Sequence, residues 1–121
     1  MKLVLIDDEP FHLIGMRTII PWEQNHFTIV GEARSGEDGI ELILRERPDI
    51  AVVDIVMPGI DGLEMIRRVK DAVPETRFIV LSCLNDIQRY KEAVSLGAAE
   101  YLQKDLATPD VLLETVRRVA Q

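Results

Sequence analysis

The chain has 121 residues, 47% hydrophobic and 29% charged, the composition of an ordinary globular protein that we expect to form one domain over residues 1–121. It contains no apolar stretch long enough to cross a bilayer and no signal peptide, so we expect no membrane contact. The single cysteine, Cys83, favours a reducing cytoplasm and is expected to be an inert core thiol. The net charge of −7 argues against direct nucleic-acid binding by this domain, because neutralising phosphates requires clustered lysine and arginine.

The first half of the chain alternates apolar runs with amphipathic segments. Lys2–Ile6 predicts a buried strand, and Pro10 suits the first turn of the helix that follows. A second strand is expected over Phe27–Gly31, and a second helix is expected to begin after Ser35, a suitable N-cap, and to end by Pro48. The first helix is expected to have a broad apolar face formed by Phe11, Leu13, Ile14, Met16 and Ile20.

The second half continues this alternation. Ile50–Val53 is a short β-branched run that predicts a strand buried on both faces, and it ends on Asp54. The remaining expected elements are a helix from Asp61, a strand over Arg77–Leu81, a helix capped by Asn85 or Asp86 and stopped by Gly97, a strand over Ala99–Leu102 and a helix from Thr108. The core positions of the helices from Asp61 and Thr108 are expected to be Leu63, Ile66, Val69, Leu112, Val116 and Val119.

The order of elements is therefore strand then helix, five times over. Such alternation implies parallel strand pairing, right-handed crossovers and helices on both faces of the sheet. The sequence predicts a doubly wound α/β domain with a five-stranded parallel sheet, a flavodoxin-like architecture.

Polar side chains follow four of the apolar strands: Asp7 with Asp8, Asp54, Ser82 and Lys104. The carboxyl ends of parallel strands share one edge of the sheet, so these side chains are expected to converge. Three carboxylates at close range could not all stay ionised without a cation. Few, all-oxygen ligands suit Mg²⁺, and Mg²⁺ together with Lys104 would balance the three negative charges.

A carboxylate beside a divalent metal and a lysine can act as the nucleophile toward a phosphoryl group, which gives an aspartyl-phosphate. The metal and Lys104 would stabilise charge on the transferring oxygens, and Ser82 could donate a hydrogen bond to one of them. No general base is needed, because a carboxylate is already ionised at neutral pH.

Several of these residues have plainer interpretations when each is taken alone. Asp54 could cap a turn, Ser82 could be a turn residue, and Tyr101 is as well explained by packing. His12 and His26 have no evident partner in the sequence and are interpreted as surface residues. Other residues with structural interpretations are Trp22 as a cover over the first helix, Asp61 as a helix cap, and Asp7 or Asp8 as a cap of the first helix.

Together these motifs resemble a bacterial two-component response-regulator receiver domain, the CheY-like family. The resemblance covers essentially the whole chain and rests on Asp7-Asp8-Glu9-Pro10, Asp54 with Met57-Pro58-Gly59 and Asp61-Gly62, Ser82, Tyr101 and Lys104. It implies the strand order 2-1-3-4-5 and a Mg²⁺-dependent signalling role.

By this resemblance, Asp54 accepts a phosphoryl group from a sensor histidine kinase. Asp8, Asp54 and the backbone carbonyl of Val56 would hold Mg²⁺, with Asp7 close by or bridging through water. The chain would catalyse its own phosphorylation without turning over an external substrate, so we do not class it as an enzyme.

The resemblance also implies a switch and an output. Ser82 and Lys104 would bind the phosphoryl oxygens, and Ser82 with Tyr101 would change the surface of the fourth helix, fifth strand and fifth helix. That surface could pair two copies on phosphorylation, and DNA would be reached only through an output domain. Ile20-Pro21-Trp22-Glu23 resembles receivers that precede AraC-type DNA-binding domains.

The chain departs from the family pattern in two places. Asp105 follows Lys104 where the family usually has proline, so a cis peptide bond is not assumed there. Val56 and Leu84, which would flank the phosphoryl group, are apolar and cannot orient a water for hydrolysis, so we expect a long-lived phosphoryl group.

Two other functions stay open on the sequence. One is an aspartyl-phosphate phosphatase or phosphotransferase similar to haloacid dehalogenases, although those carry an Asp-x-Asp pattern on the first strand that Asp7-Asp8-Glu9 lacks. The other is a pseudo-receiver, an interaction module that never accepts phosphate, which the intact acidic pair and Lys104 disfavour.

Overall fold

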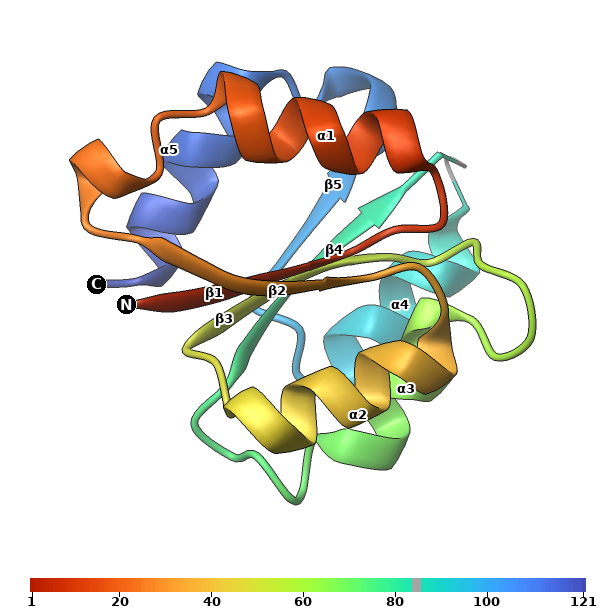
Figure 1. The fold of residues 1–121 in the computed structure, drawn as a ribbon. Coiled ribbons are helices and arrows are strands. Elements are labelled where there is room, and N and C mark those ends of the chain that lie inside the picture. Colours follow the sequence, from red (N-terminus) through yellow and green to blue (C-terminus); the bar gives the residue numbers. More distant parts are fainter. Residues whose placement is uncertain (84–85) are drawn as a thin grey trace.

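The fold is a central parallel sheet with helices on both faces, seen in a computed structural model that describes residues 1–83 and 86–121 (Figure 1). All paired strands run parallel, and their order is β2-β1-β3-β4-β5, which confirms the predicted architecture and order. The strands are β1 (Lys2–Ile6), β2 (Thr28–Ala33), β3 (Ile50–Asp54), β4 (Arg77–Ser82) and β5 (Glu100–Gln103).

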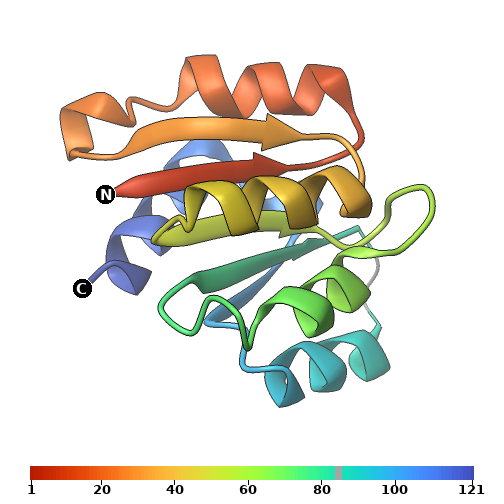
Figure 2. The ribbon, with the colours of Figure 1, turned by 60° about the horizontal axis from the view of Figure 1, so that its bottom comes forward.

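The helices divide between the two faces of the sheet. Figure 1 shows α1 and α5 over one face and α2, α3 and α4 over the other, and Figure 2 shows the sheet between these layers. The helices are α1 (Pro10–Ile19), α2 (Gly36–Glu46), α3 (Gly62–Val69), α4 (Ile87–Ser95) and α5 (Pro109–Val119), and two 3₁₀ turns, η1 (Glu23–Asn25) and η2 (Lys104–Leu106), connect neighbouring elements.

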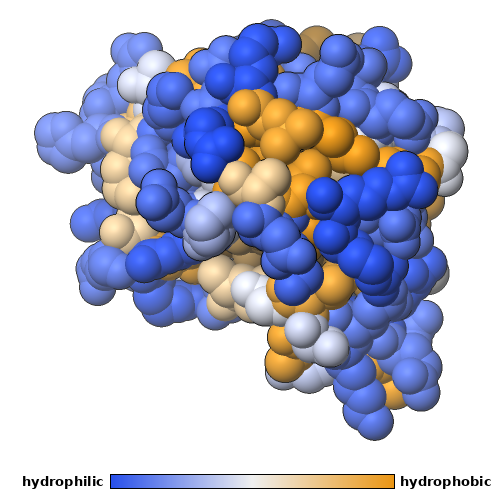
Figure 3. All heavy atoms as spheres, turned by 90° about the horizontal axis from the view of Figure 1, so that it is seen from below, coloured by the Kyte–Doolittle hydropathy of each residue, from blue (hydrophilic) through white to orange (hydrophobic). Residues whose placement is uncertain are grey.

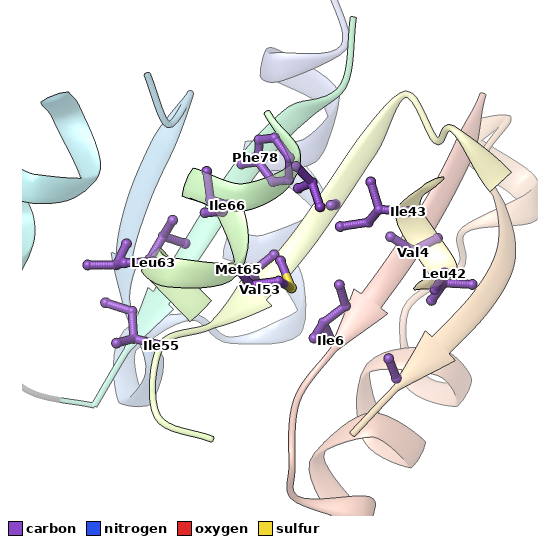
Figure 4. Packing of buried hydrophobic residues seen from close by; sticks show 14 of the residues in the cluster. Val4, Ile6, Leu42, Ile43, Val53, Ile55, Leu63, Met65, Ile66 and Phe78 are labelled. Carbon is purple, nitrogen blue, oxygen red and sulfur yellow. The ribbon is translucent and has the colours of Figure 1, made fainter. Parts of the chain in front are cut away.

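Two apolar clusters form the core, one on each side of the sheet, because successive strand residues point to opposite faces. On β1, Val4 and Ile6 pack toward α2 and α3 (Figure 4), whereas Leu3 and Leu5 lie in the cluster beneath α1 and α5. Every residue of β3 is buried, which confirms the expected two-sided burial. The six core positions predicted for α3 and α5 are all buried.

Side chains cap four of the helices at their N-termini. Ser35 accepts the Asp38 N–H at 3.1 Å, and Asp61 accepts the Glu64 N–H at 2.8 Å, so both predicted caps are confirmed. Asp86 caps α4 and Thr108 caps α5, whereas the alternative cap Asn85 lies outside the described residues. The N-cap of α1 is Glu9, without a side-chain cap bond, so neither Asp7 nor Asp8 caps that helix.

The predicted apolar face of α1 is too broad. Leu13, Met16 and Ile20 are buried, but Phe11 is 88% exposed and Ile14 is 44% exposed. The helix contacts the sheet along one narrow stripe, and these two side chains fall outside it. Trp22 closes the end of α1 as expected, since its Nε1 donates to the Met16 carbonyl at 2.8 Å.

Two further expectations need correction. The second strand runs over Thr28–Ala33, two residues beyond the predicted end, because β2 follows β1 as far as the pairing of Ile6 with Ala33. Cys83 is exposed rather than in the core, since it lies just beyond the end of β4, where the layers no longer cover the chain.

The face covered by α2, α3 and α4 is mainly hydrophilic, with a hydrophobic patch between charged side chains (Figure 3). Ion pairs connect α3 and α4 on this side: Arg67 bonds to Glu64 and Glu92, and Arg89 lies 3.2 Å from Asp61. Only Ala93 of α4 is buried, so these pairs supplement limited apolar packing of that helix.

Candidate functional site

The predicted polar residues meet at the carboxyl edge of the sheet. Asp7 follows β1, Asp54 ends β3, Ser82 ends β4 and Lys104 follows β5. Lys104 Nζ lies 2.9 Å from Asp54 Oδ2 and 3.1 Å from Asp7 Oδ2, so residues separated by as many as 97 positions are in direct contact. The parallel topology therefore produces the expected convergence.

Asp54 is 3% exposed and holds a carboxylate where water has little access. Burial raises the pKa of Asp54 above its usual value and the nearby charge of Asp7 adds to this, although the hydrogen bond from Lys104 opposes both. The Val56 N–H donates to Asp54 Oδ1 at 3.3 Å. The carboxylate is thus held on one oxygen by the backbone and on the other by a lysine.

Asp7 is fully buried and surrounded by donors. Burial alone would raise the pKa of Asp7, but hydrogen bonds from His12, the Glu9 N–H and Lys104 outweigh it and hold the pKa below its usual value. Asp7 therefore stays ionised at neutral pH. Its position is fixed by three separate donors.

Lys104 carries the positive charge shared by this site. Burial would lower the pKa of Lys104, but Asp54 and Asp7 reverse that effect and raise it, so the ammonium stays protonated. Lys104 Nζ also lies 3.3 Å from Glu9 Oε1, at the solvent side of the site. The Lys104 ammonium thus forms ion pairs with three carboxylates.

The candidate metal cluster comprises Asp7, Asp8 and Glu9. One carboxylate oxygen from each lies within 4.8 Å of the others, and only oxygen donors are present, which suits Mg²⁺. Glu9 belongs to this group, although it was not among the ligands predicted from the sequence. Its place directly after the acidic pair was the available signal.

Asp54, a further predicted ligand, lies beside this cluster rather than in it, and the fourth predicted ligand, the Val56 backbone carbonyl, follows two residues after Asp54. Asp54 is engaged by Lys104, and the Val56 side chain is 49% exposed. Lys104 contacts both Asp54 and the cluster residues Asp7 and Glu9, which makes the two groups one continuous acidic site.

His12 is not a partnerless surface residue, contrary to the expectation from sequence. Its Nδ1 contacts Asp7 Oδ2, and its side chain is only 27% exposed. The contact arises because the first turn of α1 places position 12 over the end of β1. His26, in contrast, is exposed on its loop as expected.

The loop between β3 and α3 is closed by a bond between its two ends and is tied to α2 by a second bond. The Gly62 N–H donates to the Ile55 carbonyl at 2.8 Å, and the Ile60 N–H donates to Glu37 Oε1 at 3.3 Å. No cis peptide bond occurs in the part of the chain that the structure describes, so none is observed after Lys104.

Ser82 and Tyr101 lie on neighbouring strands β4 and β5, at the edge where the acidic site is built. Ser82 is 2% exposed. The ring of Tyr101 packs edge-on against Tyr90 with ring centroids 5.5 Å apart. Its hydroxyl is buried without a hydrogen-bond partner among the described residues.

Replacing Tyr101 with phenylalanine is expected to raise the free energy of unfolding by about 1 kcal/mol, because it removes a buried hydroxyl that has no partner in residues 1–83 and 86–121. Urea denaturation measures this change. Tyr90→Phe is the matched control, since Tyr90 is 49% exposed and should change stability by less than about 0.5 kcal/mol. A loss of stability in Tyr101→Phe would contradict the expectation.

The order of strands, the acidic cluster after β1, Asp54 at the end of β3 and Lys104 after β5 define a receiver-type α/β domain. A family model of the response regulator receiver domain matches residues 3–117. The chain belongs to this family, the receiver domains of two-component response regulators, which are signalling modules.

Known proteins and structures agree with this assignment. The chain is 41% identical over 103 residues to the uncharacterized transcriptional regulatory protein YesN of Bacillus subtilis, covering 85% of this chain and 28% of YesN. It is 36% identical over 110 residues to the nitrate/nitrite response regulator NarL of Escherichia coli, covering 91% of this chain and 50% of NarL. The receiver domain of AraT from Geobacillus stearothermophilus superposes with a TM-score of 0.89 at 34% identity, covering 98% of this chain and 92% of that one.

The chain therefore spans between about a quarter and a little over half of the curated relatives it matches. Among the residues that the structure describes, no helix has both the length and the apolar character required to span a bilayer.

Proposed function

We propose that this domain is a phosphorylation switch in which Asp54 accepts a phosphoryl group. The observation that carries the proposal is the contact of Lys104 with both Asp54 and Asp7 beside an all-carboxylate cluster. An Asp54 oxygen would attack phosphorus, and the bond from phosphorus to the donor's leaving group would break. Lys104 and Ser82 would then bind the phosphoryl oxygens.

Asp8, Asp54 and the Val56 carbonyl would hold Mg²⁺ at this acidic site, with Asp7 close by or bridging through water. Carboxylate and carbonyl oxygens are the donors that Mg²⁺ prefers, and Glu9 is within reach of the same group. When bound, the ion would supply positive charge to the phosphoryl oxygens. Lys104 would supply the remaining positive charge and orient Asp54.

The proposed output is a change in the surface of α4, β5 and α5. Ser82 would follow the phosphoryl group, and the Tyr101 ring would turn inward. Support comes from the Tyr101 hydroxyl, which has no hydrogen-bond partner among the described residues and therefore loses none of these bonds when the ring moves. The exposed side chains Ile87, Tyr90 and Val94 make this face suitable for pairing two phosphorylated copies.

The proposed partners follow from this chemistry and from the relatives. A sensor histidine kinase would supply the phosphoryl group, and regulation of transcription through a DNA-binding output domain is consistent with relatives such as YesN and NarL. An AraC-type output domain stays a prediction from the sequence. The acidic charge of −7 suits contacts with basic surfaces rather than with DNA itself.

The test is the intact mass of the chain after incubation with acetyl phosphate, with and without Mg²⁺. We expect one added phosphoryl group that requires Mg²⁺ and is lost in Asp54→Ala, because no other described carboxylate has the same contact with Lys104 and the Val56 N–H. An adduct that survives in Asp54→Ala would identify a different nucleophile. No adduct under any condition would make the chain a phosphate-independent interaction module.

Val56 is expected to prolong the life of the phosphoryl group, because its half-exposed side chain is apolar and cannot orient an attacking water. Val56→Asn should lose phosphate several-fold faster, as followed by the decay of the phosphorylated mass, and Val56→Leu is an apolar control close in size to asparagine. An unchanged decay rate in Val56→Asn would contradict the expectation. The second apolar position expected beside the phosphoryl group, Leu84, lies outside the described residues.

A further inference from the structure

We propose that His12 is a positioning residue that holds Asp7 in place for metal binding. This inference rests on the proposed function, because it assigns Asp7 a part in a Mg²⁺ site. It concerns a side chain on the first turn of α1, outside the four strand ends that define the site.

The contact is direct and partly shielded from water. Asp7 is 0% exposed, and His12 Nδ1 contacts its Oδ2 atom. An ionised carboxylate can only accept hydrogen bonds, so His12 Nδ1 carries a proton and donates a hydrogen bond to Asp7. A histidine that donates a ring N–H to a carboxylate fixes the orientation of both groups.

The hydrogen bonds to Asp7 leave room for a metal ligand. Oδ1 accepts from the Glu9 N–H at 2.9 Å and from Lys104 Nζ at 3.4 Å, whereas Oδ2 accepts from His12 and lies 3.1 Å from Lys104 Nζ. Each carboxylate oxygen offers about two lone pairs, so the two hydrogen bonds to Oδ1 occupy that oxygen, while Oδ2, which accepts one hydrogen bond from His12, keeps acceptor capacity. The hydrogen bond from His12 thus fixes the oxygen of Asp7 that keeps room for a further ligand, and Asp7 belongs to the acidic cluster of Asp7, Asp8 and Glu9.

His12 is required because Lys104 is shared. Lys104 Nζ contacts Asp7, Asp54 and Glu9 at 2.9–3.3 Å, and in the proposed reaction it turns to the phosphoryl oxygens. Asp7 would then retain the Glu9 N–H and His12 as its donors. Leaving a fully buried carboxylate without one of its hydrogen-bond donors costs free energy. Without His12, the Asp7 side chain would therefore rotate toward any remaining donor.

The experiment compares Mg²⁺ binding by the parent chain, His12→Leu and His12→Asn, measured by isothermal titration calorimetry. Leucine removes the hydrogen-bond donor and replaces the imidazole with an apolar side chain of similar bulk. The asparagine amide, in contrast, places an N–H close to the position of Nδ1–H. Phe11→Leu is the matched control, because Phe11 precedes His12 on the same helix and is 88% exposed.

We expect the dissociation constant for Mg²⁺ to rise roughly tenfold in His12→Leu, to return to within about threefold of the parent in His12→Asn, and to be unchanged in Phe11→Leu. The Mg²⁺ concentration that gives half-maximal phosphoryl uptake from acetyl phosphate should shift by the same factor, while the rate at saturating Mg²⁺ changes much less. This separation distinguishes positioning of a metal ligand from general damage to the domain.

Several outcomes would overturn the inference. Equal loss in His12→Leu and His12→Asn would indicate packing alone, and tighter Mg²⁺ binding in His12→Leu would mean that His12 competes with the metal for Asp7. Unchanged binding in His12→Leu, or no Mg²⁺ binding by the parent, would also overturn it. If the parent binds Mg²⁺ but accepts no phosphoryl group, the proposed function fails while the calorimetric comparison still decides the role of His12.

Discussion

Replacement of Lys104 by methionine is expected to slow phosphoryl uptake from acetyl phosphate by roughly 10²–10³-fold, the usual effect of removing one preorganised donor from a site where charge develops. Lys104 Nζ lies 2.9 Å from the carboxylate of Asp54, the proposed nucleophile, and remains protonated because of its acidic neighbours. Methionine matches the length of the side chain without its charge. The measurement is the initial rate of phosphoryl incorporation at saturating Mg²⁺.

The same variant should bind Mg²⁺ at least as tightly as the parent, since it removes a positive charge that contacts Asp7 and Glu9 in the acidic cluster. A loss of transfer together with retained metal binding would separate charge stabilisation from collapse of the site. Lys70→Met is the matched control, because Lys70 lies at the end of α3 and pairs with Asp71. Uptake by Lys104→Met within threefold of the parent rate would contradict the role given to Lys104.

Gly62→Ala is expected to lower the free energy of unfolding by about 3 kcal/mol, because an added methyl group has no room. A Cβ at Gly62 would lie 2.3 Å from the Asp54 carbonyl oxygen and 2.9 Å from Val53 Cγ1. The first of these is a backbone atom of the central strand and cannot rotate away. Relief of the clash would require α3 to move away from Asp54, the proposed phosphoacceptor.

Gly15→Ala is the matched control for that substitution. Its Cβ would meet nothing closer than Ile19 Cδ1 at 3.9 Å, and alanine is favoured over glycine in a helix, so a gain of about 0.5–1 kcal/mol is expected. Urea denaturation of both variants against the parent measures the two changes. Equal and small effects would show that the close approach of α3 to β3 tolerates a methyl group.

The architecture and most of the convergence at the site could be predicted from the sequence alone, because both depend on local patterns of apolar and polar residues. Strands such as Ile50–Val53 are apolar without interruption because both of their faces are covered, and the polar residue that ends each strand marks the edge of the sheet. Parallel topology then brings those ends together, so Asp7, Asp54 and Lys104 could be predicted to meet. Helix caps such as Ser35 and Asp61 bond to residues only three positions away, so they could also be predicted from the sequence.

Features that depend on how separate elements pack were decided by the tertiary structure. The spacing of apolar residues in α1 could not show that the sheet covers only a narrow stripe, which leaves Phe11 exposed. The partner of His12 is set by the angle at which α1 leaves the end of β1, and nothing in the local pattern encodes that angle. The buried hydroxyl of Tyr101 likewise results from the packing of α4 over β5, where Tyr90 covers its ring.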